Sequence, residues 1–172
     1  MGERGYYHCD MKPKNIMVNA KSFKIKIIDF EDFYYDKSKN PLLTDQDVGT
    51  IGYMSPEACT EGTLDLKQSL VFSIGCILYS CIEKKLPFKS ESDTIECKPL
   101  EMTTSSLSAS LFIKKCTERD PWKRVRFSEL LRDKWFNFRS SLSSNRRCMN
   151  TNNNKYTNKI CNDITKGSFM RC

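Results

Sequence analysis

The sequence predicts a mainly α-helical (α+β) domain with a short β-hairpin, and two observations give this class. The run from Ser69 to Ile82 is apolar on nearly every side, which is typical of a helix buried in a core. Two apolar segments, Ile16 to Asn19 and Phe23 to Ile28, flank a short turn-like stretch and predict the hairpin. We expect further helices toward the end of the domain, the first of them beginning at Leu111.

The composition is that of one domain with a tail, and it disfavours several kinds of site. The chain has 172 residues, 39% of them hydrophobic, which is enough for one core. Its nine cysteines form no C-x-x-C pair and it has one histidine, so we expect neither a zinc site nor a disulfide framework. No secretory signal or long apolar span is evident, so we expect an intracellular protein, in cytoplasm or nucleus, that does not bind membranes.

The net charge of +7 is concentrated beyond the domain, which we expect to span residues 1–137. Residues 138–172 are rich in Asn and Ser and hold a single acidic residue, Asp163. We predict that this basic tail is solvated and disordered. A nucleic-acid-binding arm is the alternative, and the scarcity of aromatic residues in the tail disfavours it.

The loop around Pro13 sets a carboxylate, an ammonium and an amide close together, on Asp10, Lys12 and Asn15. Pro13 lacks an N–H and has a fixed φ angle, so the segment is predicted to be a rigid loop and not a helix. These side chains suit phosphoryl transfer. Asp10 can accept the proton of an attacking hydroxyl, Lys12 can neutralise phosphate charge, and Asn15 can hold a hard cation. The alternative is a Pro-containing surface loop with scattered charges.

The segment His8 to Asn15 reads H-C-D-M-K-P-K-N, which resembles the protein-kinase catalytic loop H-R-D-L-K-P-x-N. The resemblance implies that Asp10 is the catalytic base, that Lys12 contacts the nucleotide phosphates and that Asn15 is a Mg²⁺ ligand. Cys9 replaces the arginine that in this family reads a phosphate on the activation loop. We therefore expect phosphorylation of that loop to matter less in this chain.

The tetrapeptide Ile28-Asp29-Phe30-Glu31 resembles the kinase D-F-G motif, whose Asp holds Mg²⁺. The predicted hairpin returns the chain, so we expect Asp29 near Asn15, where the two side chains would be the cofactor-binding metal ligands. The alternative for Asp29 is an Asx turn that ends a strand. Glu31 replaces a glycine, so we expect a shifted loop and an added carboxylate beside the metal site.

The polar stretch Glu31 to Val48 predicts a mobile loop, and a more specific motif follows it at Val48 to Glu57. This motif resembles the G-T-x-x-Y-x-A-P-E end of a kinase activation segment. The resemblance implies that Thr50 contacts Asp10 and Lys12, and that the following loop seats the substrate. The pairing of this lysine with a Gly-Thr dipeptide is similar to the Ser/Thr branch of the family.

The apolar run near the middle of the chain resembles the central helix of a kinase large lobe, and Gly75 within it permits close approach of a neighbour. Leu70 stands where the family has an aspartate that bonds to the catalytic loop, so we expect a less rigidly held loop, with Asp65 as a candidate substitute. Ser128 is expected to cap the last helix. The predicted inner face of that helix carries Leu130, Leu131 and Trp135.

Four such motifs follow in kinase order between His8 and Phe136, so the chain is identified as a member of the eukaryotic protein kinase family. It resembles the Ser/Thr type and is loosely similar to the dual-specificity spindle-checkpoint kinases. The resemblance also implies a buried ion pair between Glu57 and Arg124, for which two surface charges are the alternative. Only the large lobe is matched, because the chain has no G-x-G-x-x-G loop and no V-A-I-K-type lysine. We expect the small lobe to be absent and the face toward it to be apolar and open to a protein partner.

The resemblance implies Mg²⁺- and ATP-dependent phosphoryl transfer to Ser or Thr of protein substrates. Without the Gly-rich loop and the lysine of the ATP lobe, the autonomous activity of this truncated kinase is in doubt. The alternative is a non-catalytic, pseudokinase-like binding or scaffold module. Cys9, Glu31 and Leu70 favour that alternative.

Overall fold

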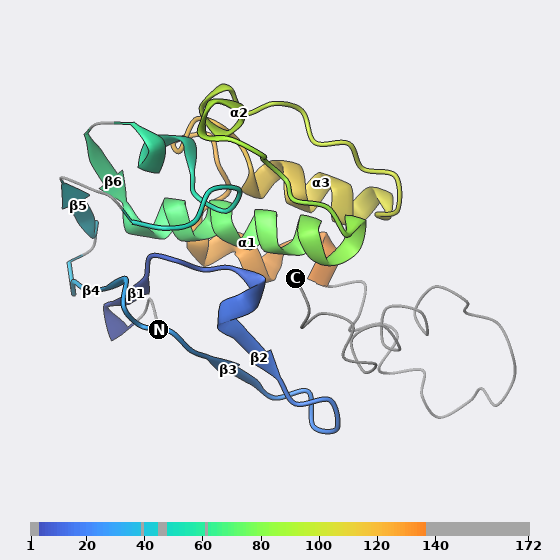
Figure 1. Cartoon of the computed structure of the whole chain (residues 1–172), viewed down its shortest axis with the longest axis horizontal. Helices are drawn as coiled ribbons and strands as arrows, with labels where there is room; N and C mark the ends of the chain where they lie inside the picture. Colours follow the sequence, from blue (N-terminus) through green and yellow to red (C-terminus); the bar gives the residue numbers. More distant parts are fainter. Residues whose placement is uncertain (1–3, 39, 45–47, 61, 137–172) are drawn as a thin grey trace, which may run out of the picture.

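The computed structural model describes residues 4–38, 40–44, 48–60 and 62–136, arranged around one central helix, α1 (Figure 1). The predicted disordered tail, residues 138–172, lies outside the described residues. The elements in chain order are β1 (Tyr6–His8), the 3₁₀ helix η2 (Pro13–Asn15), β2 (Ile16–Val18), β3 (Ile25–Ile27), β4 (Phe33–Tyr35), β5 (Leu42–Thr44), the 3₁₀ helix η3 (Pro56–Cys59), β6 (Thr63–Asp65), α1 (Leu66–Glu83), α2 (Glu91–Glu96), α3 (Leu107–Cys116) and the 3₁₀ helix η4 (Phe127–Arg132).

Helix α1 is the predicted buried helix, extended by a few residues at its N-terminal end. Its Val71, Phe72 and Cys76 side chains are fully buried. By length and composition alone α1 could cross a membrane, but its contacts with the rest of the domain are those of a core helix. Asp65 caps its N-terminus and accepts hydrogen bonds from two backbone N–H groups, so it does not substitute for the aspartate missing at Leu70.

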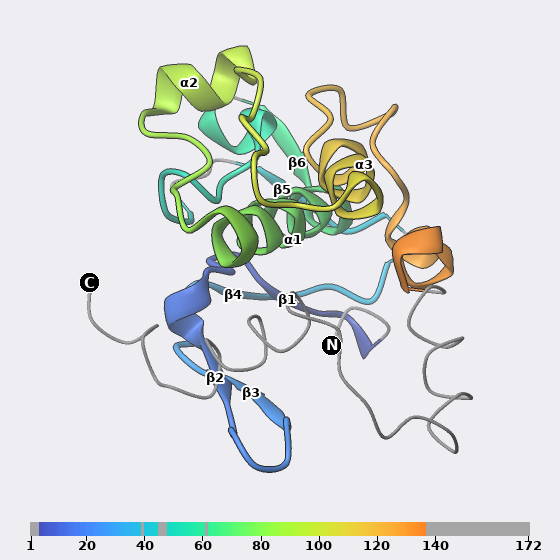
Figure 2. The same cartoon turned by 90° about the vertical axis from the view of Figure 1, so that its right-hand side faces the viewer.

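Helices α2 and α3 lie on one side of α1, and β1, β4, η2 and the β2–β3 hairpin lie on the opposite side (Figure 2). Gly75 allows α3 to pack closely, because a Cβ there would lie 2.7 Å from Cβ of Cys116 and 2.8 Å from Cγ2 of Thr117. The close approach predicted for Gly75 is thereby confirmed. The main cluster between α1, α3 and η4 contains Val71, Phe112, Cys116 and Leu130.

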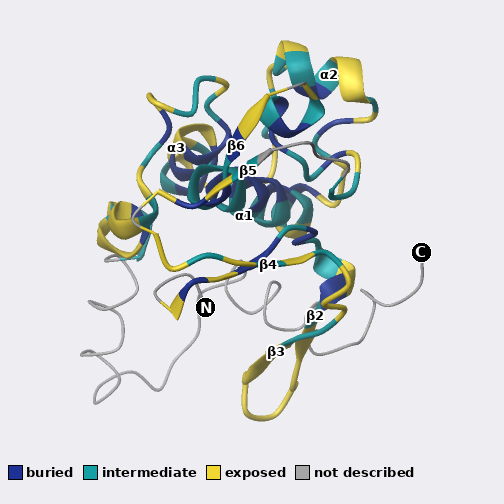
Figure 3. Cartoon of the chain, turned by 90° about the vertical axis from the view of Figure 1, so that its left-hand side faces the viewer, coloured by how far each residue is buried: buried dark blue, intermediate teal, exposed yellow. Residues whose placement is uncertain are grey.

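The predicted hairpin is present but shorter than expected. β2 and β3 pair antiparallel with Ile16 opposite Ile27 and Val18 opposite Ile25. Phe23 lies outside the strand in the left-handed region, with a φ angle of 55°. The apolar side of the hairpin has no cover in the described structure, since Ile25 is 67% exposed (Figure 3).

The interpretation of residues 31–48 as one mobile loop is wrong for two segments. β4 pairs with β1, with Tyr7 opposite Tyr34, and β5 pairs with β6, with Leu43 opposite Leu64. Each strand is three residues long and its partner lies far away in the sequence, so no local pattern indicates it. Both ladders hold this part of the chain against the core cluster of Tyr7, Ala58, Leu64 and Leu66.

Three expectations about the C-terminal elements are also wrong. α3 begins at Leu107, four residues before the expected start, because Ser106 caps it by accepting from the Ala109 N–H. Ser128 does not cap η4: it lies inside that helix, which has no side-chain cap. Leu130 is buried as expected, whereas Leu131 is 78% exposed, because successive residues of a helix point in different directions.

Candidate active site

Three side chains from two distant segments meet at the catalytic-loop motif. Lys12 Nζ forms an ion pair with Asp10 Oδ2 and donates a hydrogen bond of 2.8 Å to Thr50 Oγ1. The Thr50 hydroxyl in turn donates to Asp10 Oδ1 at 2.7 Å. Asp10 is 8% exposed, so this hydrogen-bonded carboxylate lies in a largely dehydrated place. The contacts expected for Thr50 are thus present.

The side-chain amide of Asn15 orients Asp10 through hydrogen bonds. The 3₁₀ helix η2 begins with Pro13, whose fixed φ suits a first helical position, and the Asn15 N–H donates to the Lys12 carbonyl at 3.0 Å. The Asn15 side chain is 3% exposed, and its Nδ2 donates to the Asp10 carbonyl at 2.9 Å and to Asp10 Oδ2 at 3.4 Å. Because the amide nitrogen is used in this way, the amide oxygen of Asn15 is the atom left to meet a cation.

His8 joins the catalytic loop to the end of the hairpin, a role that the sequence reasoning missed although the residue is part of the motif. Its Nε2 is 3.0 Å from the Ile28 carbonyl, and its Nδ1 accepts from the Asp10 N–H at 3.3 Å. With these partners Nδ1 is the nitrogen that accepts, and Nε2 is the nitrogen placed to donate to the Ile28 carbonyl. The ring also contacts Phe30, with 5.2 Å between the centroids.

Asp29 lies next to Asn15 along the backbone, because the Ile28 N–H donates to the Asn15 carbonyl at 3.0 Å. Its carboxylate is exposed and makes no hydrogen bond or ion pair within the described ranges. The backbone of Asp29 has a φ angle of 64°, a conformation that costs an L residue about 1–2 kcal/mol. Glu31, which replaces the glycine of the motif, has no positive φ; the residue in the left-handed region is Asp29.

The amide oxygen of Asn15 and the carboxylate of Asp29 are ligands of the kind that a hard cation such as Mg²⁺ prefers, and this ion binds one or two protein oxygens together with phosphate and water. The free Asp29 carboxylate supplies the charge, and no cation of the described residues competes for it. Over the same residues there is no group of three or more His, Cys, Asp or Glu side chains that could hold a metal by themselves. This arrangement therefore suits a metal that arrives with a phosphate ligand.

The loop after Thr50 is fixed to α1. The Ser73 hydroxyl donates to the Tyr53 carbonyl at 2.9 Å, and the Ser80 hydroxyl donates to the Tyr53 hydroxyl at 3.3 Å. Gly49 has a φ angle of 111°, and a Cβ there would lie 2.8 Å from Met54 Cγ and 3.3 Å from the Cys9 carbonyl. The loop thus passes close to the catalytic loop where only glycine fits.

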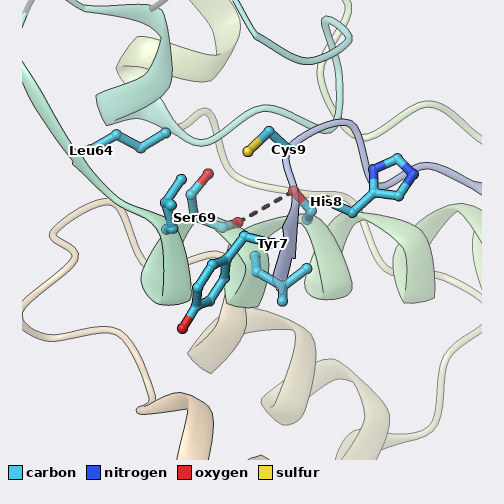
Figure 4. A pocket seen from close by; sticks show the side chains of 8 residues that line it. Tyr7, His8, Cys9, Leu64 and Ser69 are labelled. Atoms are coloured by element: carbon cyan, nitrogen blue, oxygen red, sulfur yellow. Dashed lines mark hydrogen bonds between the residues drawn. The ribbon is translucent and has the colours of Figure 1, made fainter. Parts of the chain in front are cut away.

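A small cavity lies beneath the catalytic loop, where Leu70 of α1 replaces the expected aspartate. Figure 4 shows Tyr7, Cys9, Leu64 and Ser69 around it, with the His8 ring pointing away. Burial, and then the nearby Asp32 carboxylate, raises the pKa of the Cys9 thiol to about 11. Cys9 is therefore an uncharged apolar contact at a position where the kinase motif has a cation.

Glu57 and Arg124 lie away from the Asp10 cluster and pair with each other inside the domain. The predicted site residues thus fall into two groups. Asp10, Lys12, Asn15 and Thr50 are joined by hydrogen bonds, with Asp29 on the adjoining backbone, and Glu57 and Arg124 form a separate structural pair.

Sequence comparisons with known proteins find protein kinases, in agreement with the motifs that form this site. A sequence model of the protein kinase domain matches residues 1–136. The serine/threonine-protein kinase MPS1 of Encephalitozoon cuniculi is 30% identical over 146 residues, which cover 80% of this chain and 25% of that protein. Mitogen-activated protein kinase kinase 1 of Arabidopsis thaliana is 31% identical over 150 residues, covering 77% of this chain and 41% of that protein. The serine/threonine-protein kinase PSK2 of Saccharomyces cerevisiae is 30% identical over 135 residues, covering 77% and 12%. The chain therefore spans less than half the length of each of these relatives.

Proposed function

The chain belongs to the protein kinase family, and from this premise we propose that it takes part in ATP-dependent phosphoryl transfer to Ser or Thr hydroxyls of proteins. The observation that carries the proposal is the hydrogen-bonded group of Asp10, Lys12 and Thr50. A buried carboxylate held between an ammonium and a hydroxyl is fixed in orientation, as a base for an attacking hydroxyl must be.

Each residue of the site has a role in this proposed reaction. Asp10 orients the acceptor hydroxyl and takes its proton, and Lys12 lies beside it to neutralise charge on the transferred phosphoryl group. Thr50 fixes both side chains and ties the substrate-seating loop to the catalytic loop. Asn15 and Asp29 would hold Mg²⁺, which neutralises and orients the phosphates of ATP when bound.

We further propose that the chain supplies the large lobe of a kinase domain and works inside the cell. A protein partner would bind its exposed apolar face. This face contains the hairpin and the β1–β4 ladder. It carries exposed apolar side chains that water does not favour and that a protein surface would cover. They are Tyr6, Met17, Val18, Phe23, Ile25, Phe30, Phe33 and Tyr35. Nucleic-acid and membrane binding are not part of this proposal, and a closer relation to dual-specificity spindle-checkpoint kinases stays a prediction.

A non-catalytic binding module of kinase descent is the second candidate. Cys9 and Leu70 favour it, because each removes a charged group that the kinase motif uses to hold the catalytic or activation loop. In this case the same exposed face would serve for binding a protein, and Asp10 would have a structural role only.

Binding of Mg²⁺-ATP to the full chain separates the two candidates. We expect ATP with Mg²⁺ to raise the thermal unfolding midpoint of the wild type, and Asp29→Asn to lose this rise. The matched control is Glu129→Gln, an exposed acid in η4 far along the chain, which should retain it. Asp10→Asn should bind Mg²⁺-ATP and yet transfer no phosphate. A wild-type chain that shows no rise supports the binding module and contradicts the catalytic proposal.

A further inference from the structure

Glu83, the last residue of α1, is a buried carboxylate that the proposed chemistry does not use. It is 6% exposed and accepts hydrogen bonds from the backbone N–H groups of Thr103, Thr104 and Ser105, at distances of 2.8 to 3.1 Å. No cation of the described residues pairs with it. These consecutive donors hold the segment before α3 against the end of α1.

The hydroxyl of Thr103 joins this group. Thr103 Oγ1 donates to Glu83 Oε2 at 3.1 Å, while the Thr103 residue itself is exposed. The neighbouring Thr104 is also exposed but bonds Glu83 only through its backbone. The two threonines therefore differ in one feature, the contact between the side-chain hydroxyl and the carboxylate. Burial alone would raise the pKa of Glu83, but the donors around it lower the pKa to about 2, so the carboxylate is charged at neutral pH.

We propose that Thr103 is a phosphorylation site and that a phosphate there releases residues 103–105 from α1. A phosphothreonine carries a charge of about −1.5 to −2 at neutral pH and would lie on the oxygen that now donates to Glu83. The hydroxyl proton that bridges the two residues is lost, and two anions replace a hydrogen-bonded pair. Because the carboxylate is buried, water screens this repulsion weakly.

The modification is an ordinary phosphoryl transfer from a nucleoside triphosphate by a Ser/Thr kinase. The Thr103 oxygen forms a bond to the γ-phosphorus, the bond from that phosphorus to the bridging oxygen breaks, and the nucleoside diphosphate leaves. The hydroxyl proton passes to the base of the modifying enzyme. The inference does not depend on whether this chain is itself a catalyst.

The end of α1, which residues 103–105 contact through Glu83, adjoins the substrate-seating loop. Glu83 is followed by Lys84, the C-cap of α1 with a φ angle of 58°, and Leu86 lies two residues further along the chain. A Cβ on Gly52 would lie 2.8 Å from Leu86 Cδ1 and 2.8 Å from the Phe88 carbonyl, so these residues pack tightly on the loop that carries Thr50. A displacement of the end of α1 is therefore expected to reach this loop through Leu86.

The test compares two phosphate-mimicking variants of the full chain by hydrogen exchange and thermal unfolding. We expect Thr103→Glu to speed the exchange of the amides of residues 103–105 by about tenfold or more and to lower the unfolding midpoint. Thr104→Glu is the matched control and should change neither. Thr103→Val, which removes the hydroxyl without adding charge, should have an effect smaller than that of Thr103→Glu.

Repulsion from Glu83 is tested by a second substitution. In the Glu83→Gln background the amide oxygen still accepts hydrogen bonds but carries no charge, so Thr103→Glu should lose most of its effect. Equal effects of Thr103→Glu and Thr104→Glu, or an undiminished effect in the Glu83→Gln background, would overturn the mechanism. The assignment of the site is tested by mass-spectrometric mapping after treatment with a purified Ser/Thr kinase and Mg²⁺-ATP. Phosphate on Thr103 that forms faster in Glu83→Gln supports the assignment, and labelling of Thr104 or Ser105 without Thr103 overturns it.

Discussion

Arg124 and Glu57 face each other through two parallel hydrogen bonds, from Nη1 to Oε1 at 2.6 Å and from Nη2 to Oε2 at 2.9 Å. The arginine side chain is 0% exposed and the glutamate side chain is 15% exposed. Arg124 also donates to the backbone carbonyls of Gln68, Glu118 and Arg119. A single guanidinium thus joins η3, α1 and the segment after α3.

Removing either partner of this pair should destabilise the domain strongly. Arg124→Ala leaves a carboxylate without its partner, and Glu57→Ala leaves a buried cation, each at a cost of about 3–5 kcal/mol. Urea unfolding of both single variants and the double variant measures the coupling between them. Lys123→Ala, at a side chain 75% exposed, is the control and should change the free energy of unfolding by less than about 1 kcal/mol. Additive losses in the double variant would contradict the pairing.

The Thr50 hydroxyl should matter more for catalysis than for folding. Thr50→Val keeps the shape but removes the bonds to Asp10 and Lys12, so kcat/KM should fall by roughly 10–150-fold, the equivalent of about 1.5–3 kcal/mol. Thr50→Ser keeps the hydroxyl and should retain most of the activity. The assay is phosphate transfer from ATP to a protein substrate, with Thr60→Val, which alters an exposed hydroxyl, as control. Similar losses in the Ser and Val variants would show that the hydroxyl is not the important group.

The catalytic loop could be predicted from the sequence because its chemistry is local. Asp10, Lys12 and Asn15 lie within six residues, and one proline determines the shape of the loop between them. The position of Thr50 required a family resemblance, since its partners lie 38 and 40 residues away. The central helix could be predicted equally well, because its apolar residues continue over several turns.

What escaped prediction depends on contacts between segments that have no strong local pattern. The pairing of Tyr7 with Tyr34 stabilises two short strands that propensity alone cannot identify. From the sequence, Glu83 is expected to be an exposed acid at the end of a helix. Its burial is explained only by the contacts that residues 103–105 make with it. The left-handed backbone of Asp29 was not predicted, because the only local signal in this motif is the replacement of a glycine by Glu31.

Gly75 should resist substitution by alanine although alanine favours helices. Its absent side chain allows α3 to approach, and an added methyl group would lie 2.7 Å from Cβ of Cys116. We expect Gly75→Ala to lower the free energy of unfolding by about 1–3 kcal/mol through overpacking, which exceeds the gain of about 1 kcal/mol in helix propensity. Cys81→Ala, at an exposed position of the same helix, is the control and should stay within about 0.5 kcal/mol. Stabilisation by Gly75→Ala, measured by urea unfolding, would contradict the close packing of α1 and α3.

Glu83 should make the stability of the domain depend on pH in the acid range. Its pKa is lowered from 4.5 to about 2, because the hydrogen bonds from residues 103–105 outweigh the opposing effect of burial. The unfolded chain therefore takes up a proton at a higher pH than the folded one. The stabilising contribution is complete above about pH 4.5 and is lost as the pH falls toward 2.

The measurement is the free energy of urea unfolding from about pH 7 to about pH 3 for wild type and Glu83→Gln. Other carboxylates titrate in both proteins, so the difference between the two curves isolates Glu83. We expect this difference to favour the wild type at neutral pH and to shrink as the pH falls below about 4.5. Glu129→Gln, which alters an exposed acid in η4, should run parallel to the wild type throughout. A difference between wild type and Glu83→Gln that stays constant over the whole range would mean that the carboxylate charge does not hold residues 103–105, and the repulsion proposed for a phosphate on Thr103 would lose its basis.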